Sequence, residues 1–150
     1  HYCGRVKKLD AADTEIPHRR WLPVVAVALV DGEGRVLVQQ RPPGGSMAGL
    51  WEFPGGKVER DETPEIALIR ELREELGIDV TAACLAPACF ASEPLGDRHL
   101  LLLLYVCRKW SGTPQARHAA ALQWLRPPQL FGLAMPPADK PLLGLLDALL

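Results

Sequence analysis

The segment from Thr63 to Gly77 constrains the fold most, because helix start and stop signals flank a two-sided pattern. Thr63 can cap a helix, Pro64 suits its first position, and Gly77 can take the left-handed conformation that ends it. We therefore predict a helix over residues 64–76. At 100° per residue, its apolar side is predicted to carry Ile66, Ile69, Leu72 and Leu76. The other side gathers Glu71, Glu74 and Glu75.

Three carboxylates on one helical face repel one another, by roughly a few tenths of a kcal/mol per pair. A divalent cation would offset this repulsion, because magnesium and manganese bind carboxylate oxygens and commonly bridge them to substrate phosphates. The pattern therefore predicts a metal site for a phosphate-bearing substrate. The alternative interpretation of the same three residues is a solvated acidic face, which is the usual situation of acidic clusters on helices.

The residues around this helix extend the pattern into a longer motif. Counting from Gly56, the chain has five residues, Glu62, seven residues, Arg70-Glu71-Leu72, one residue, Glu74-Glu75, one residue and Gly77-Ile78. These residues match all nine fixed positions, over 23 residues, of the Nudix box G-x5-E-x7-R-E-U-x-E-E-x-G-U, in which U is a bulky aliphatic residue. By this resemblance the chain is identified as a member of the Nudix hydrolase family.

The resemblance implies a fold and an activity. The implied fold is α/β (α+β), a mixed β-sheet sandwiched between helices, with the box forming a loop, a helix and a loop. The implied reaction is attack of water on a phosphorus of a nucleoside diphosphate derivative, with Mg²⁺ (or Mn²⁺) neutralising the phosphate charge.

The implied catalytic residues are Glu71, Glu74, Arg70 and Glu62, with Arg70 holding the glutamates in place. The implied metal ligands are Gly55, Glu71, Glu74 and Glu75. For the Gly55-Gly56 pair, a simple tight turn is the alternative to a close approach of backbone to the ion or phosphate.

The rest of the chain favours the same fold class. The β-branched run of residues 21–30, the turn residues 31–34 and the strand pattern of 35–41 predict a β-hairpin, and the Pro/Gly-rich residues 42–49 predict a loop. Further along, we predict one or two strands over 78–90 with a bend near Pro87, strands over 99–108 and 120–125, and an amphipathic helix over 140–150. Strands, a helix, strands and a helix indicate a mixed sheet with helices on its faces.

Several segments outside the box resemble MutT proteins within this family. They are Leu50–Glu59 (LWEFPGGKVE), Asp97–His99, Trp110-x-Gly112 and Met135–Asp139, and the resemblance runs from about Leu22 to the C-terminus. It implies hydrolysis of 8-oxo-dGTP to the monophosphate and pyrophosphate, which keeps oxidised guanine out of DNA. The substrate-binding residues that it implies are Arg41, Ser46, Glu52, Phe53, Pro54, Gly55, Lys57, Arg98 and Asp139.

Three positions depart from the MutT pattern. Asp139 stands where the bacterial archetype has an asparagine; an ionised carboxylate could accept both donors of guanine, and a helix cap before Lys140 is the alternative. His118 stands where MutT proteins have a further glutamate, and is either a base or metal ligand or a plain surface histidine. Ser46 replaces a histidine near the nucleotide.

The bulk properties limit the partners. With 17 Lys plus Arg against 18 Asp plus Glu, the charge is nearly balanced, which argues against a long nucleic acid and leaves a small nucleotide as the expected partner. The longest apolar run, residues 100–107, suits a buried strand and is too short to span a membrane. The cysteines, Cys3, Cys84, Cys89 and Cys107, lack C-x-x-C spacing and are predicted to be reduced, which favours a cytoplasmic enzyme.

The domain division and the competing functions complete the predictions. We expect residues 1–20 to be an N-terminal extension of unknown role, and residues 21–150 to form one Nudix hydrolase domain, as a monomer or homodimer. The alternatives to 8-oxo-dGTP hydrolysis are a house-cleaning pyrophosphatase for another nucleotide such as CTP, and a Nudix module that binds nucleotides without catalysis.

Overall fold

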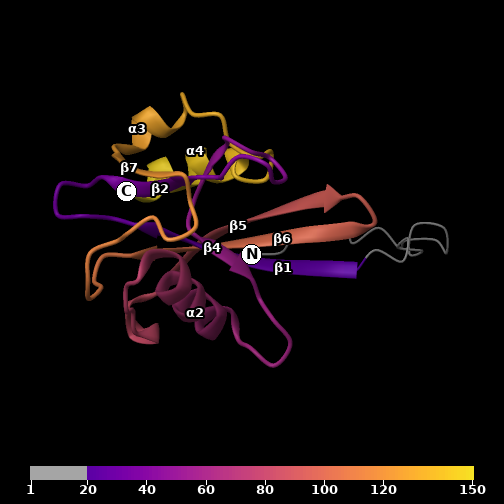
Figure 1. Cartoon of the computed structure of the whole chain (residues 1–150), viewed down its shortest axis with the longest axis horizontal. Helices are drawn as coiled ribbons and strands as arrows, with labels where there is room; N and C mark the ends of the chain where they lie inside the picture. Colours follow the sequence, from indigo (N-terminus) through magenta and orange to yellow (C-terminus); the bar gives the residue numbers. More distant parts are fainter. Residues whose placement is uncertain (1–19) are drawn as a thin grey trace, which may run out of the picture.

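A computed structural model describes residues 20–150, which form two β-sheets flanked by helices (Figure 1). The predicted extension therefore lies outside the described residues, except for Arg20, which begins the first strand. The larger, mixed sheet has the strand order β4-β1-β6-β5, in which β1 and β6 are parallel and the other neighbours antiparallel. Its strands are β1 (Arg20–Leu29), β4 (Gly55–Lys57), β5 (Ala86–Leu95) and β6 (Arg98–Cys107).

The smaller sheet is antiparallel with the order β3-β2-β7. Its strands are β2 (Val36–Gln40), β3 (Trp51–Glu52) and β7 (Ala121–Leu125). The helices are α2 (Pro64–Leu76), the 3₁₀ turn η1 (Ala82–Cys84), α3 (Pro127–Leu130) and α4 (Lys140–Leu149). No helix in residues 20–150 is long and apolar enough to cross a bilayer.

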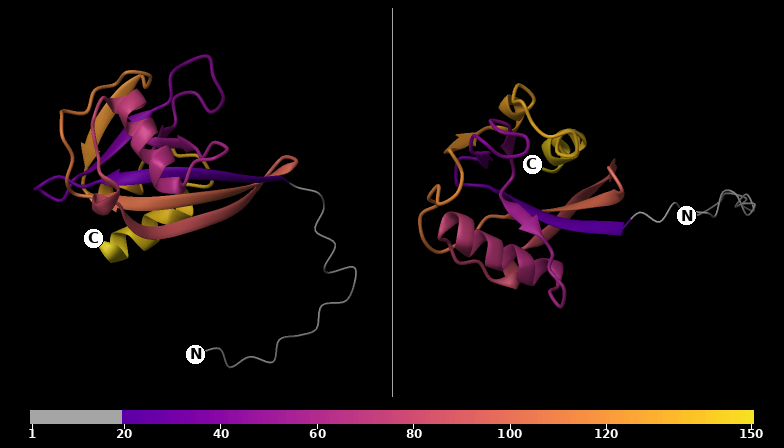
Figure 2. Two further views of the ribbon diagram at one scale, coloured as in Figure 1. Left: turned by 90° about the horizontal axis from the view of Figure 1, so that it is seen from below. Right: turned by 45° about the vertical axis from the view of Figure 1, so that its right-hand side comes forward.

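Side chains of β1 alternate between two cores because successive residues of a strand point to opposite faces. Val25, Val27 and Leu29 pack with the buried residues of α2, whereas Ala26 and Ala28 pack with those of α4. The helices accordingly cover opposite faces of the mixed sheet (Figures 1 and 2). The predicted mixed sheet between helices is confirmed.

The helix that was predicted from its capping signals is present with the predicted bounds. The Thr63 hydroxyl accepts a hydrogen bond from the Ile66 amide, and Gly77 ends the helix with φ 69°. The predicted apolar side was partly wrong: Ile66 is 54% exposed, and the buried residues are Ala67, Leu68, Leu72 and Leu76. The buried side of α2 is therefore rotated toward Leu68, while Ile66 lies in the first turn of the helix.

Two other expectations were wrong. The predicted hairpin ends after one bridge between Val30 and Val36, because β1 and β2 then diverge into different sheets. The strand expected to begin at Ile78 is limited to a bridge between Asp79 and Ser111, followed by η1 and then by β5. The bend expected near Pro87 is a register shift in the pairing of β5 with β6.

Within the described residues, Cys84, Cys89 and Cys107 are free thiols.

Candidate active site

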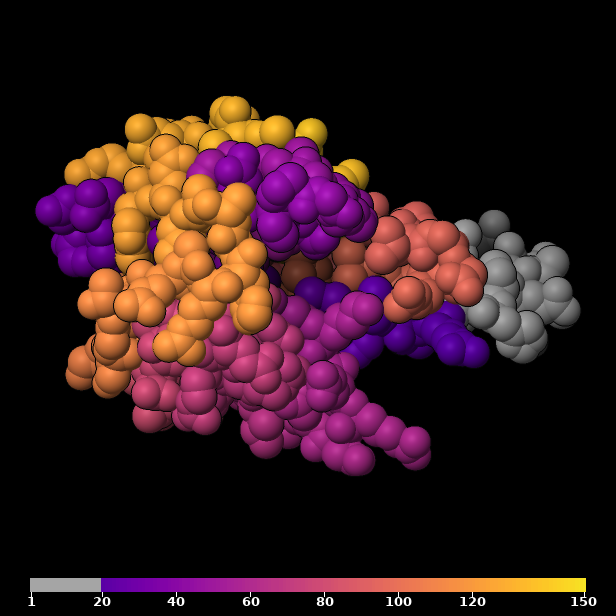
Figure 3. Space-filling view, viewed as in Figure 1, coloured from indigo at the N-terminus to yellow at the C-terminus, as the bar shows by residue number. Residues whose placement is uncertain are grey.

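A cavity of about 740 Å³ opens between the two sheets. Figure 3 shows its mouth as a hollow between the loop after β2, the segment after β4 and the turn between β5 and β6. This volume is in the range of cavities that hold small molecules, about 300–1,000 Å³. Its floor is apolar and consists of alternate residues of neighbouring strands, namely Leu22, Val24, Ala26, Leu100 and Leu102.

One wall of the cavity carries an ion pair between Arg41 and Glu52. The Arg41 Nε donates to Glu52 Oε2 at 2.9 Å, and Arg41 Nη1 donates to the Ser46 carbonyl at 3.3 Å. Burial raises the pKa of Glu52, although the Arg41 charge acts in the opposite direction. Arg41 thus holds the loop after β2 against β3, so that Ser46 and Met47 line the cavity.

Asp139 lines the same cavity as this ion pair and is only 6% exposed. Burial raises the pKa of Asp139 to about 7, with a further rise from the Glu52 charge and a lowering from Arg41. Asp139 occupies the N-cap position of α4, yet its side chain makes no capping hydrogen bond. The capping alternative is therefore not realised, and the Asp139 carboxyl lines the cavity.

The end of the cavity next to α2 is formed by Glu75 together with Gly55, Gly56 and Lys57. Glu75 Oε2 accepts a hydrogen bond from Gln39 Nε2 at 3.1 Å. Burial raises the pKa of Glu75 to about 7, with further rises from the Glu71 and Glu52 charges that the hydrogen bond from Gln39 and the neighbouring Gly55 amide only partly offset. The fold thus concentrates negative charge at this end.

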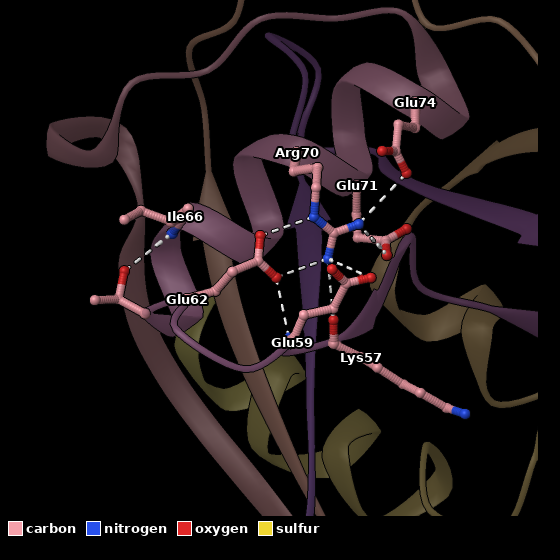
Figure 4. A network of polar contacts seen from close by, with 8 residues as sticks. Lys57, Glu59, Glu62, Ile66, Arg70, Glu71 and Glu74 are labelled. Carbon is pink, nitrogen blue, oxygen red and sulfur yellow. Dashed lines mark hydrogen bonds and ion pairs between the residues drawn. The ribbon is translucent and has the colours of Figure 1, made fainter.

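Arg70 connects four carboxylates beside this end (Figure 4). It donates to both oxygens of Glu62 at 2.8 Å and to Glu71 at 2.9 Å, and it lies 3.4 Å from Glu74 and 3.9 Å from Glu59. The hydrogen bond from Arg70 lowers the pKa of Glu62, and the Glu62 acceptor raises the pKa of Arg70. One guanidinium faces four carboxylates, so the cluster retains a net negative charge.

Both glycines of the Gly55-Gly56 pair lie in close contact with their neighbours. A Cβ on Gly55 would clash with the Val25 carbonyl oxygen of β1, and one on Gly56 would clash with the Glu71 carboxyl atoms. The absence of a side chain at Gly56 therefore lets the Glu71 carboxylate reach the backbone of β4. A tight turn alone would not require this second contact.

The three glutamates do not gather as one group. Glu71 and Glu74 turn toward Arg70, whereas Glu75 turns toward Gln39 and the cavity. Across residues 20–150, no set of three or more His, Cys, Asp or Glu side chains has the geometry of a metal site. The donor set nevertheless fits a divalent cation, because the Glu71 charge raises the cost of ionising Glu75 and the hydrogen-bond donor to Glu75, Gln39, is neutral. Carboxylate and peptide oxygens are the donors that magnesium prefers.

Most of the predicted substrate residues meet at the cavity. Eight line it: Arg41, Ser46, Glu52, Phe53, Gly55, Lys57, Arg98 and Asp139. Pro54 does not; it is buried, and its carbonyl accepts a hydrogen bond from the Val27 amide of β1. His118 is exposed and does not line the cavity.

Sequence reasoning missed Gln39, Met47 and Glu93. Gln39 is 6% exposed and orients Glu75, and the signal for it was the polar Gln39-Gln40 pair at the end of an apolar strand. Met47 and Glu93 line the cavity, but neither belongs to a motif that would have indicated a site.

Comparisons with known proteins identify the family. The model of the NUDIX domain family matches residues 20–146. The chain is 40% identical over 125 residues to a CTP pyrophosphohydrolase of Escherichia coli, covering 83% of this chain and 91% of that protein. It is 33% identical over 126 residues to an 8-oxo-dGTP diphosphatase of the same organism, covering 83% and 96%.

Solved structures share the fold. The solution structure of the E. coli ORF135 protein superposes with a TM-score of 0.78 at 39% identity, covering 87% of this chain and 91% of that one. A MutT structure from a study of Aliivibrio salmonicida and Vibrio cholerae superposes with a TM-score of 0.72 at 28% identity, covering 87% and 100%.

Proposed function

Because the chain belongs to the NUDIX domain family, we propose that it is a nucleoside triphosphate pyrophosphohydrolase that yields a monophosphate and pyrophosphate. The single observation that carries this proposal is the position of Glu75, which joins a carboxylate-rich end to a cavity of nucleotide size.

In the proposed mechanism, Glu71, Glu74 and Glu75, with the Gly55 backbone, would hold Mg²⁺ or Mn²⁺. When bound, such an ion supplies charge neutralisation for the phosphates and lowers the pKa of a coordinated water. Arg70 holds Glu62, Glu71 and Glu74 in one network, so that these carboxylates do not repel one another out of position. Glu71 is the proposed residue that orients or deprotonates the attacking water, with Lys57 near the phosphates.

We propose that the base lies on the apolar floor, with its edge toward Asp139 and Glu52. Guanine presents two adjacent donors on its Watson–Crick edge, which an ionised carboxylate at Asp139 can accept. This favours a guanine nucleotide, and the leading proposed substrate is 8-oxo-dGTP, with sanitation of DNA precursors in the cytoplasm as the role. The base or the sugar would contact Arg41, Ser46, Phe53 and Arg98.

CTP is the second candidate, because an E. coli relative that is 40% identical is a CTP pyrophosphohydrolase. Cytosine presents a donor beside an acceptor, which suits a protonated carboxyl, since that group both donates and accepts. With a pKa of about 7, Asp139 supplies the protonated form below neutral pH and the ionised form above it. The preference for CTP over guanine nucleotides should therefore rise as pH falls from 8 to 6.

The test is steady-state kinetics with 8-oxo-dGTP, dGTP and CTP at saturating magnesium, at pH 6, 7 and 8, with the products identified. A kcat/KM for 8-oxo-dGTP well above that for dGTP and CTP supports the leading substrate, and the reverse order supports CTP. Absence of turnover with all three nucleotides, together with tight nucleotide binding, would instead indicate a non-catalytic module.

A further inference from the structure

The loop of residues 111–118, between β6 and β7, packs against the C-terminal end of α2. Figure 3 shows this loop in orange against the magenta and pink surface of the helix. The Gln115 amide donates to the Leu76 carbonyl at 2.9 Å, and the Arg117 amide donates to the Glu75 carbonyl at 3.1 Å. The last carbonyls of a helix have no partner inside it, so these bonds anchor the final turn to the loop.

Arg117 adds its side chain to this contact. Its Nη1 donates to the Arg73 carbonyl at 3.2 Å, and its guanidinium lies over Gly77, where an added Cβ would come within 2.5–2.9 Å of Nη2, Cζ and Nε. Gly77 thus serves two purposes: it ends the helix with φ 69°, and it leaves room for the guanidinium. A cation at this position also interacts favourably with the negative end of the helix dipole.

Glu75 lies in the turn that is held in this way. Its main-chain carbonyl accepts from Arg117, while its carboxyl accepts from Gln39. If the last turn frayed, the Glu75 carboxyl would leave Gln39, because side-chain position follows the backbone. His118, the next residue along the loop, is exposed and does not reach the cavity.

We propose that Arg117 is a positioning residue that holds the last turn of α2 so that Glu75 presents its carboxyl to a divalent cation. This inference rests on the proposed function and deepens it. The loop then acts on the site through the helix end that Arg117 caps, and not through the side chain of His118. Groups behind metal ligands commonly change metal affinity when they are removed, by about 10- to 100-fold when they touch the ligand itself.

The test compares Arg117→Gln with Arg126→Gln. Arg126 is a matched control because its Nη1 also donates to a single main-chain carbonyl, that of Glu33, at 3.0 Å, in an exposed position away from α2. The dissociation constant for Mn²⁺ is measured by electron paramagnetic resonance without nucleotide. Because Arg117 acts through the backbone, we expect Arg117→Gln to raise the dissociation constant for Mn²⁺ by about three- to tenfold. We expect Arg126→Gln to leave this constant unchanged and Arg117→Lys to give an intermediate value.

Amide hydrogen exchange supplies a second readout. In Arg117→Gln, the amides of the last turn of α2 should exchange faster while those of its first turn do not. Equal Mn²⁺ affinities in folded Arg117→Gln, Arg126→Gln and wild type would overturn the positioning role. If Arg117→Gln does not fold, the Mn²⁺ affinity of Arg117→Lys decides the question in the same way. A wild-type protein that binds no Mn²⁺ would instead refute the proposed function.

Discussion

Replacing Glu75 with glutamine should stabilise the metal-free protein at alkaline pH. In the fold, burial together with the Glu71 and Glu52 charges raises the pKa of Glu75 from its ordinary 4.5 to about 7. The folded state therefore binds this proton more tightly than the unfolded chain does. Well below pH 4.5, both states hold the proton and no stability is lost. Stability falls as pH rises from 4.5 to 7, and the loss is complete above 7.

The size of the effect follows from this difference in pKa. It corresponds to about 3 kcal/mol of unfolding free energy, since one pKa unit is worth about 1.4 kcal/mol. Glutamine keeps the shape of the side chain and an oxygen that can accept from Gln39, but it carries no charge. At pH 8 the Glu75→Gln protein should therefore be more stable than wild type by up to about 3 kcal/mol, or on the order of 10 °C in Tm for a domain of this size.

Urea denaturation in EDTA at pH 5, 6, 7 and 8 measures this effect in both proteins. Glu74→Gln is the control, because the Glu74 side chain is 55% exposed and lies 3.4 Å from Arg70, so the same gain is not expected. Magnesium should reverse the order of stability by binding the wild type. A difference between Glu75→Gln and wild type that does not change with pH would refute the electrostatic argument.

Three further predictions follow from particular contacts. Gly56→Ala should cut turnover by at least tenfold in steady-state assays with Mg²⁺, because its Cβ would displace the Glu71 carboxyl; wild-type turnover in this variant would show that Glu71 tolerates displacement. Asp139→Ala should raise KM for guanine nucleotides more than for those of uracil, measured across a nucleotide panel, and equal losses would indicate a structural role. Leu68→Ala should cost about 2–5 kcal/mol in urea denaturation and Ile66→Ala less than about 0.5; equal costs would contradict the observed orientation of α2.

Local signals in the sequence predicted the helix of the box well. Thr63, Pro64 and Gly77 act within a few residues of the chain, and their effect does not depend on distant partners. The buried side was harder to predict, because Ile66 and Leu68 are equally apolar. Which of them is covered depends on where the helix begins relative to the sheet beneath it.

The positions of the first two strands depend on segments elsewhere in the chain with which they pair. The turn after β1 is well formed, with the Asp31 carboxylate accepting from the Glu33 and Arg35 amides, so the local prediction of a turn was correct. The strands separate because β1 pairs with β6 over its whole length and β2 pairs with β7. These partners are far away in the sequence, and periodicity does not identify them.

The site was predictable where a motif covered it. The resemblance to MutT segments indicated the cavity residues from four separate stretches of chain, including Asp139. It did not indicate Gln39, whose role arises because β2 passes beside α2, or Arg117, whose role depends on how the loop before β7 packs on the helix end. Each of these contacts joins elements that the sequence alone does not place side by side.

Product analysis of a single nucleotide reaction tests the central claim most directly. Phosphorus NMR of 8-oxo-dGTP or CTP incubated with the protein and Mg²⁺ should show the monophosphate and pyrophosphate appearing in equal amounts. The signals should be absent in EDTA and reduced by orders of magnitude in Glu75→Gln. Release of inorganic phosphate, or unchanged turnover in the Glu75→Gln protein, would contradict a metal-dependent pyrophosphohydrolase centred on this glutamate.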